Sequence, residues 1–197
     1  DLPQSPQLPE KIVLSDDFTI FGEMSCFACN KIFKKALFEN HRFRNGIHFE
    51  DIELIPKLVL DSSIISKINE PFYKYFERQN SISKTHTEKG LDMFVAVNEV
   101  TNYFYQSKYN TFATELKRFQ IIQGYYSYLA YLAYVKDKNL KRKMLNVLND
   151  FLKANNLTKK ELKNYIRFDR NYLNSLPLKK RIFYHLAMIY PQLLLKF

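Results

Sequence analysis

The sequence predicts a predominantly helical protein, in which a short α/β part is followed by a longer run of helices. From Leu91 onward, apolar residues recur at three- and four-residue spacing, which indicates helices. We expect them at about 91–107, 110–136, 138–154, 159–171 and 177–196. Before residue 90, short β-branched and aromatic runs indicate strands instead. The change of pattern divides the chain into an N-terminal part, residues 1–90, and a C-terminal part, residues 91–197.

Composition excludes several broad classes. The chain has 197 residues, with 46% hydrophobic and 25% charged residues, which are values of a globular protein. Only 4 glycines and 7 prolines are present, which excludes collagen-like and low-complexity sequences. No run of 18 apolar residues occurs, so the sequence predicts no transmembrane helix.

The N-terminal part is predicted to mix short elements. Residues 12–14, 64–68 and 72–76 are expected to be strands, and residues 23–39 show a helical rhythm. A second helix is expected at about 50–60, because acidic residues at its start suit the positive end of the helix dipole. Pro56 lies inside it and is tolerated near the first turn or causes a kink. The polar residues 78–90 are predicted to be a loop.

Two features of the C-terminal part refine the helix prediction. Thr158 with Glu161 three residues later fits a capping box, which indicates a helix start. Residues 103–135 are rich in tyrosine and phenylalanine. Interleaved with bases, such residues can stack on nucleotides, but bases are few here, so we interpret this run as a packed helix.

The positive charge is confined to one end of the chain. Residues 1–136 carry 16 basic and 16 acidic side chains, whereas residues 137–197 carry 14 basic and 4 acidic ones. The whole net charge of +10 therefore belongs to the last 61 residues. Such a block suggests a polyanionic partner, which is nucleic acid, an anionic membrane surface or an acidic substrate.

Cys26 and Cys29 form a single C-x-x-C pair. A structural zinc site needs four ligands, and no second cysteine pair or close histidine pair follows. A redox dithiol would need a thioredoxin-like setting, which the surrounding residues do not indicate. We therefore expect two free, partly buried thiols in a reducing compartment.

Adjacent carboxylates at Glu50 and Asp51 follow a glycine turn at a predicted strand-to-helix junction. A carboxylate held there could act as a general base on a hydroxyl group. Two acidic residues at a helix start also commonly serve only as dipole and cap partners. Arg78, in a polar loop with Ser81, could receive phosphate oxygens. The residues alone leave these alternatives open.

Three segments stand in order, namely residues 28–38 (ACNKIFKKALF), 46–58 (GIHFEDIELIPKL) and 68–83 (INEPFYKYFERQNSIS). Together they resemble the acceptor-side half of a family 2 glycosyltransferase. The similar stretch, residues 21–82, covers roughly a third of the chain. The resemblance implies an α/β fragment of a GT-A-like domain. It also implies transfer of a sugar, with inversion, from a nucleotide-sugar to a glycan or lipid-linked acceptor in cell-surface polysaccharide synthesis.

The resemblance assigns roles to individual residues. Asp51 matches the family's general base, and Glu50 would shape the acceptor site. Asn30 and Lys31 fall in the acceptor-side motif. Two residues, Arg78 and Ser81, match a loop that closes near the donor diphosphate, where the planar guanidinium of arginine suits phosphate.

His86 is a few residues further along the same predicted loop. It is expected either to approach the metal or diphosphate or to lie in solvent.

The family's donor-binding half is not matched. That half carries an Asp-x-Asp motif, which holds a divalent Mn²⁺ or Mg²⁺ ion that neutralises the diphosphate. The chain has Asp16 and Asp17 but no Asp-x-Asp, and its first residue is Asp1. We therefore expect it to be a portion of a longer enzyme and to lack transferase activity by itself.

The last segment, residues 176–197, joins the basic cluster of residues 179–181 to an apolar run, which is the pattern of an interfacial anchor. With the basic residues 141–143 and 159–160, it predicts a cytoplasmic protein on the inner face of the cell membrane. Packing of the run on the protein itself is the alternative. A further hypothesis is a non-catalytic, basic helical module that binds membrane or nucleic acid. No nucleic-acid-binding signature supports nucleic acid as the partner.

Overall fold

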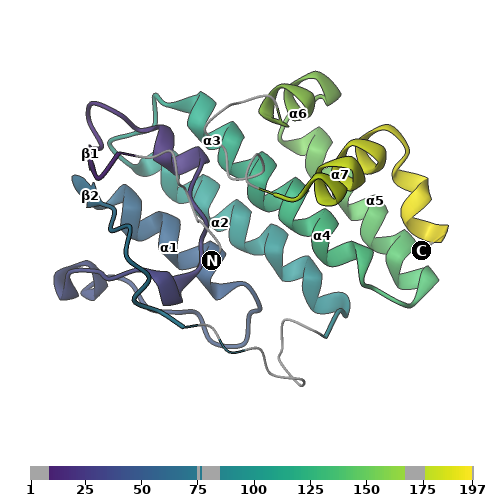
Figure 1. Ribbon diagram of the computed structural model, residues 1–197, viewed down its shortest axis with the longest axis horizontal. Coiled ribbons are helices and arrows are strands. Elements are labelled where there is room, and N and C mark those ends of the chain that lie inside the picture. The colour runs from purple at the N-terminus through teal and green to yellow at the C-terminus, as the bar shows by residue number, and fades with distance from the viewer. Residues whose placement is uncertain (1–8, 75, 77–84, 167–175, 197) are drawn as a thin grey trace.

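Helices predominate in the computed structural model, which describes residues 9–74, 76, 85–166 and 176–196 (Figure 1). The α-helices are α1 (Glu50–Leu60), α2 (Asp92–Gln106), α3 (Ala113–Phe119), α4 (Tyr128–Ala133), α5 (Lys138–Ala154), α6 (Lys159–Ile166) and α7 (Leu178–Ile189). The strands are β1 (Lys11–Val13) and β2 (Ile64–Ser66). Short 3-10 helices are η1 (Thr19–Gly22), η2 (Ala28–Asn30), η3 (Lys35–Phe38), η5 (Glu88–Leu91) and η8 (Pro191–Lys196). The π-helix η6 (Gln120–Ser127) joins α3 to α4.

The two strands pair antiparallel, with Ile12 opposite Ile65. The strands predicted at 12–14 and 64–68 are thus confirmed, each within about two residues. The strand predicted at 72–76 is wrong for the described residues of that range, which belong to no strand. Alternating aromatic residues favour a strand only where a neighbouring strand supplies hydrogen bonds, and none of the described residues does so here.

The helix predicted at 23–39 is also wrong. This segment forms the two short 3-10 helices η2 and η3 with extended residues between them. Its apolar spacing has a different explanation. Met24 and Cys26 enter the main core, whereas Phe33 and Leu37 pack separately against α1, so no single helical face is buried.

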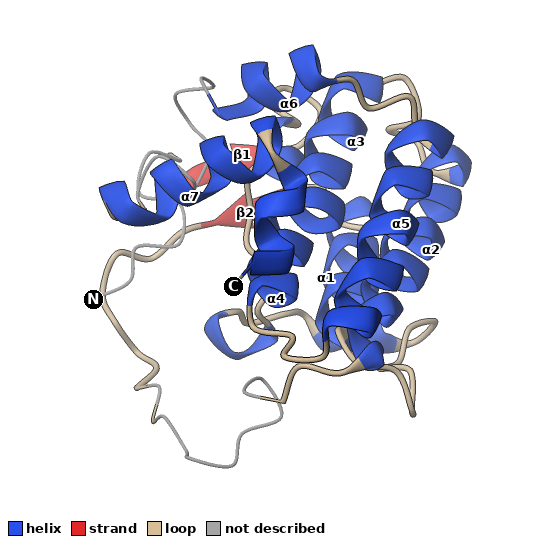
Figure 2. Cartoon of the chain, turned by 90° about the vertical axis from the view of Figure 1, so that its right-hand side faces the viewer, coloured by secondary structure: helices blue, strands red, loops and turns tan. Residues whose placement is uncertain are grey.

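The predicted helices at 50–60 and 91–107 are confirmed as α1 and α2. Helix α1 continues through Pro56, which lacks the amide hydrogen that would bond one turn back. The predicted helix at 110–136 is α3, η6 and α4 in succession, and α5 matches the prediction at 138–154. Figures 1 and 2 show α1, α2, this long helix and α5 as the main body of the molecule.

Helix α6 begins at the predicted capping box. The Thr158 amide donates to Glu161 Oε2 over 2.8 Å, and the Glu161 amide donates to Thr158 Oγ1 over 3.3 Å. Residues 167–171 of the predicted helix lie outside the described residues. The predicted helix at 177–196 is divided into α7 and η8, because Pro191 cannot continue the helix hydrogen bonding.

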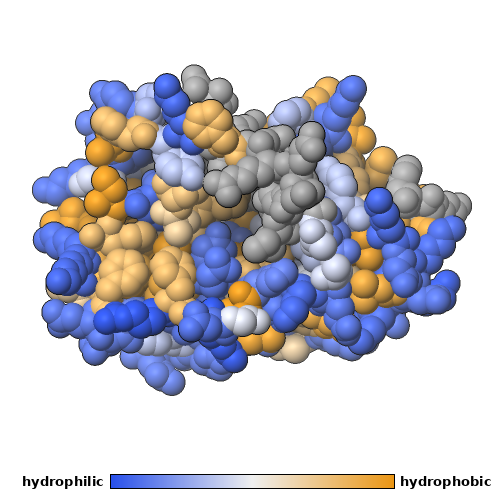
Figure 3. Space-filling model, turned by 90° about the horizontal axis from the view of Figure 1, so that it is seen from below, coloured by the Kyte–Doolittle hydropathy of each residue, from blue (hydrophilic) through white to orange (hydrophobic). Residues whose placement is uncertain are grey.

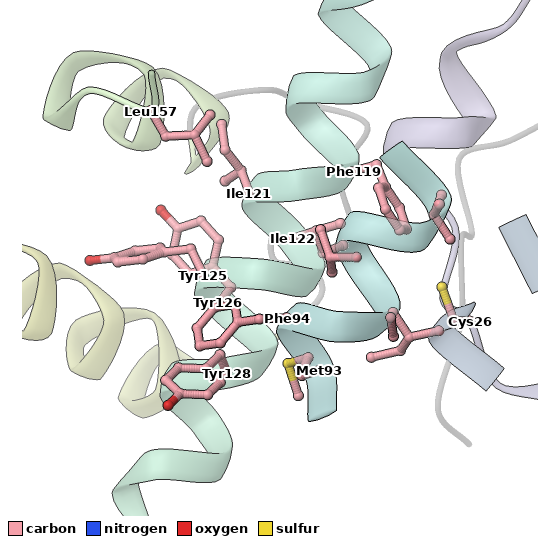
Figure 4. Packing of buried hydrophobic residues seen from close by; sticks show 14 of the residues in the cluster. Cys26, Met93, Phe94, Phe119, Ile121, Ile122, Tyr125, Tyr126, Tyr128 and Leu157 are labelled. Carbon is pink, nitrogen blue, oxygen red and sulfur yellow. The ribbon is translucent and has the colours of Figure 1, made fainter. Parts of the chain in front are cut away.

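One hydrophobic core extends through both parts of the chain (Figure 4). Phe21, from the N-terminal part, lies between Phe104 of α2 and Phe119 of α3, with ring centroids 5.6 and 5.2 Å away. The aromatic run at 103–135 supplies the fully buried Tyr126 and Tyr128. The interpretation of that run as a packed helix is therefore confirmed.

Candidate functional site

The first residues of α1 are placed by an unusual backbone turn. Gly46 has φ of 81°, and Phe49, the residue before the helix, has φ of 64° and ψ of 36°. A left-handed conformation is strained for phenylalanine, so packing must hold it. The Phe49 ring packs edge-on against Tyr131 of α4, at 5.6 Å between centroids. This contact fixes the direction in which Glu50 and Asp51 leave the turn.

Asp51 is half-buried in the first turn of α1. Its Oδ1 accepts a hydrogen bond of 2.8 Å from the amide of Ile52. Burial raises the pKa of Asp51 to about 6, and the Glu50 carboxylate adds to this rise. The Ile52 amide and the Lys31 ammonium oppose it. Asp51 is therefore mainly ionised at pH 7 but remains a much better proton acceptor than an ordinary aspartate.

Lys31 lies within electrostatic range of Asp51, although the two are far apart in sequence. It follows η2, and its Nζ donates to the Phe27 carbonyl over 2.9 Å and to Asn30 Oδ1 over 2.8 Å. Burial lowers the pKa of Lys31, and the neighbouring acidic groups oppose this effect. The structure thus places the predicted residues Lys31 and Asp51 within electrostatic range of each other, and Asn30 contacts Lys31.

The cysteine pair belongs to the same site. Both thiols are free, with Cys26 buried and Cys29 exposed. Burial raises the pKa of the Cys26 thiol, and the charge of Asp51 adds to the rise, so Cys26 remains protonated. The predicted free thiols are confirmed, but neither is partly buried, since Cys26 is buried and Cys29 is exposed.

The remaining predicted residues are Glu50, Arg78, Ser81 and His86. Glu50 is exposed at the first position of α1. Arg78 and Ser81 lie outside the described residues. The His86 ring lies 4.7 Å from the ring of Tyr131, measured between centroids. Because Tyr131 also contacts Phe49, His86 is at the same end of α1 as Asp51.

The side chains around Asp51 do not fit a divalent metal ion. Lys31 places a positive charge beside the carboxylate, and the nearby Cys26 thiol is protonated. Within the described part of the chain, no three His, Cys, Asp or Glu side chains gather as a metal site would require. We therefore derive no chemical step through a metal from these residues.

A hydrogen-bonded group that sequence reasoning missed lies at the opposite end of α1. His41 Nε2 is 2.6 Å from Asp61 Oδ2, and the Tyr103 hydroxyl donates to Asp61 Oδ1 over 2.9 Å. Burial and the hydrogen bond to Asp61 raise the pKa of Tyr103 to about 12. The group ties the segment after η3 to α1 and α2. No spacing in the sequence could reveal it, because its members come from three elements.

An open cavity of about 310 Å³ lies beyond the C-terminal end of α1, away from Asp51. It is lined by Val13, Ser15, Ser63, Lys108, Tyr109 and Phe112. The lining offers no carboxylate and no histidine. The chemical groups of interest are therefore those around Asp51.

Comparisons of the chain with family models, curated proteins and solved structures gave no match. They show no family for it. Its function must be argued from the residues and their arrangement.

Proposed function

We propose that the chain is the acceptor-side part of an inverting glycosyltransferase, in which Asp51 is the general base. The observation that carries the proposal is the half-buried carboxylate of Asp51 at the start of α1, whose pKa burial raises to about 6, within electrostatic range of Lys31. A helix cap would need no raised pKa. The first two of the three sequence segments that resemble family 2 enzymes supply Asn30, Lys31 and Asp51 independently of the structure.

The proposed step uses Asp51 as a proton acceptor. The acceptor hydroxyl attacks the anomeric carbon of the donor sugar from the face opposite the diphosphate. Its proton passes to an oxygen of Asp51, a new carbon–oxygen bond forms, and the bond to the nucleoside diphosphate breaks. The amide of Ile52 and the positive charge of Lys31 both favour the ionised form of this half-buried carboxylate, and so oppose the rise in pKa that burial causes.

The donor side of the proposed reaction depends on other residues. Arg78 and Ser81 are proposed to contact the donor diphosphate, and His86 is proposed to lie near them. Divalent Mn²⁺ or Mg²⁺ remains an expectation for the whole enzyme, held by residues that this chain does not contain. A GT-A-like fold for the N-terminal part is likewise part of the proposal, since two short strands do not establish it.

Exposed apolar side chains support the proposal that the chain is part of a larger enzyme. Large apolar residues are exposed repeatedly in the N-terminal part, namely Phe27, Ile32, Phe43, Ile64, Ile68, Phe72, Tyr73 and Phe76. Figure 3, which views the molecule from below, shows apolar side chains gathered in the left half of the picture. Extended apolar surface commonly marks an interface. We propose that a donor-binding half covers this surface.

The test is Asp51→Asn in a polypeptide that includes the donor-binding half. We expect the rate of sugar transfer to fall by about 10²–10⁴, because asparagine cannot accept the proton. Asp150→Asn, at an exposed position of α5, is the matched control and is expected to leave the rate unchanged. Activity of Asp51→Asn within a few-fold of the unaltered enzyme would overturn the assignment. Turnover of a nucleotide-sugar by the 197-residue chain alone would overturn the proposal that a separate donor-binding half is needed for activity.

A further inference from the structure

Helix α7 has a buried face and an opposite apolar face that is exposed. Tyr184, Ala187 and Met188 are buried against the rest of the protein. Leu178, Ile182, Leu186 and Ile189 are 69%, 47%, 47% and 52% exposed. Their spacing of four, four and three residues places them on one side of the helix. The helix therefore directs a continuous apolar stripe toward solvent, which stability of the fold alone does not require.

Three cations border the start of this stripe. Lys179, Lys180 and Arg181 are exposed in the first turn of α7, which contains no acidic residue. At about 100° per residue, Lys179 and Arg181 lie on either side of Leu178. Cations at a helix N-terminus add to the positive end of its dipole instead of neutralising it. Throughout the described chain, no acidic side chain forms an ion pair with any of the three.

The remaining parts of the basic C-terminal region are less suited to binding a surface. Lys141 is only 2% exposed, and Lys143 forms an ion pair with Glu88. In η8, Leu194 is buried against the core. Exposed lysines also occur on α6, but among the described residues from 137 onward the large exposed apolar side chains lie on α7 and at Tyr190 directly after it. An exposed apolar stripe and exposed cations therefore coincide on α7, and we assign the anchor predicted for residues 176–197 to this helix. Figure 2 shows α7 at the edge of the molecule.

We infer that α7 docks on an anionic membrane, with its apolar stripe at the boundary between headgroups and acyl chains. An apolar face flanked by basic residues is the pattern of helices that lie in this interface. No helix within the described residues is both long and apolar enough to cross a bilayer. A second copy of the chain fits the surface less well, because the paired α7 would offer no acidic residue to the three cations. The inference does not depend on the proposed glycosyltransferase function.

Because the chain contains no tryptophan, a single introduced tryptophan reports the environment of α7. Leu186→Trp is mixed with vesicles of phosphatidylcholine alone or with phosphatidylglycerol. We expect a blue shift of the fluorescence, and pelleting of the protein, with the anionic vesicles only. Val95→Trp, at an exposed position of α2, is the matched control and should show no shift. Absence of a shift for Leu186→Trp on anionic vesicles would overturn the inference.

Two double variants separate the two contributions to binding. Lys179→Gln with Arg181→Gln should weaken partition into anionic vesicles by roughly 25-fold, about fivefold for each charge. The matched pair Lys159→Gln with Lys160→Gln, on the exposed surface of α6, should change it far less. Ile182→Gln with Ile189→Gln should reduce it at least about tenfold. Circular dichroism identical to that of the unaltered chain verifies that each variant is folded.

Analytical ultracentrifugation without lipid tests whether a second copy of the chain, rather than a membrane, covers the apolar stripe of α7. We expect the same sedimentation for the unaltered chain and for Ile182→Gln with Ile189→Gln. A dimer that this variant dissociates, together with unchanged vesicle binding, would show that the stripe joins two copies and would overturn the membrane inference.

Discussion

The pKa of about 6 at Asp51 has a consequence for stability that is separate from catalysis. An unfolded aspartate ionises near pH 4, so the folded protein holds the proton more tightly than the unfolded chain. The favourable contribution of protonated Asp51 to the free energy of unfolding is therefore fully present below about pH 4, and it is lost as the pH rises through about 6. At neutral pH, the ionised Asp51 thus destabilises the fold. A charge that costs stability in the folded protein is a common property of active sites.

Asp51→Asn should therefore stabilise the 197-residue chain at pH 7, by about 1–2 kcal/mol in the free energy of unfolding. Asparagine keeps an oxygen for the Ile52 amide but carries no charge to bury. At pH 4 the difference should disappear, because Asp51 is then protonated in the folded protein. Urea unfolding of both proteins at the two pH values measures this. An equal stability difference at both pH values would contradict the raised pKa.

Sequence patterns identified Asp51 and Lys31 but could not establish their proximity from spacing alone. The turn at Phe49, the buried setting of Cys26 and the contact of Tyr131 with both Phe49 and His86 all depend on tertiary packing. The type and order of the residues were sufficient to single out these candidates. The burial that raises the pKa of Asp51 comes from tertiary packing.

At the scale of elements, the π-helix η6 packs unusually close to helix α5. Gly124 lies in η6, and a Cβ atom at this position would overlap the ring of Phe151 on α5. Gln120, also in η6, donates hydrogen bonds to Thr101 Oγ1 and Asn155 Oδ1, over 3.2 and 2.8 Å. The wider turn of the π-helix thus places the buried Gln120 side chain where it can bond to α2 and to the residue that follows α5. A π-helix commonly interrupts an α-helix for such a specific local requirement.

Gly124→Ala should lower the free energy of unfolding by about 1–3 kcal/mol, although alanine favours helices, because the added methyl group must displace Phe151. Urea unfolding followed by circular dichroism is the measurement. In the background of Phe151→Leu, which shortens the opposing side chain, the same substitution should cost much less. Equal losses in the two backgrounds would show that contact with Phe151 is not the cause.

Helices were more predictable than strands or short turns. Helices α1, α2 and α5 have a regular apolar period and clear ends, so local sequence was sufficient. In residues 23–39, apolar residues at similar spacing serve two separate clusters, and periodicity alone cannot distinguish that arrangement from a helix. The interruption of the long helix by η6 was not predictable either, because it depends on the neighbouring helices.

At the scale of the whole molecule, the boundary near residue 90 separates composition but not packing. Helices α1 and α2 pack across it, and η1 packs on α3. The Tyr165 hydroxyl of α6 also donates to the Gly22 carbonyl over 3.0 Å. The neutral N-terminal part and the basic C-terminal part therefore share one core while presenting different surfaces. Proposed chemistry and proposed membrane binding belong to these different surfaces.

A chain of residues 91–197 alone should consequently fail to form a rigid fold. Phe104 and Phe119 would lose their contacts with Phe21, and α2 would lose α1. We expect helical far-ultraviolet circular dichroism to remain while the near-ultraviolet signal is lost and unfolding becomes gradual. The unaltered 197-residue chain is the control. A sharp urea transition in the shortened chain would show that its helices form an independent domain.

The contrast between the two thiols makes the chain suited to site-specific chemical labelling. Cys29 is exposed, whereas Cys26 is buried and its pKa is raised, and the chain has only these 2 cysteines. A maleimide dye or a nitroxide should therefore attach at one position without removal of any native residue. The attached group would be one residue from Asn30 and two from Lys31. The chain thus carries a natural reporter position beside its most chemically distinctive side chains.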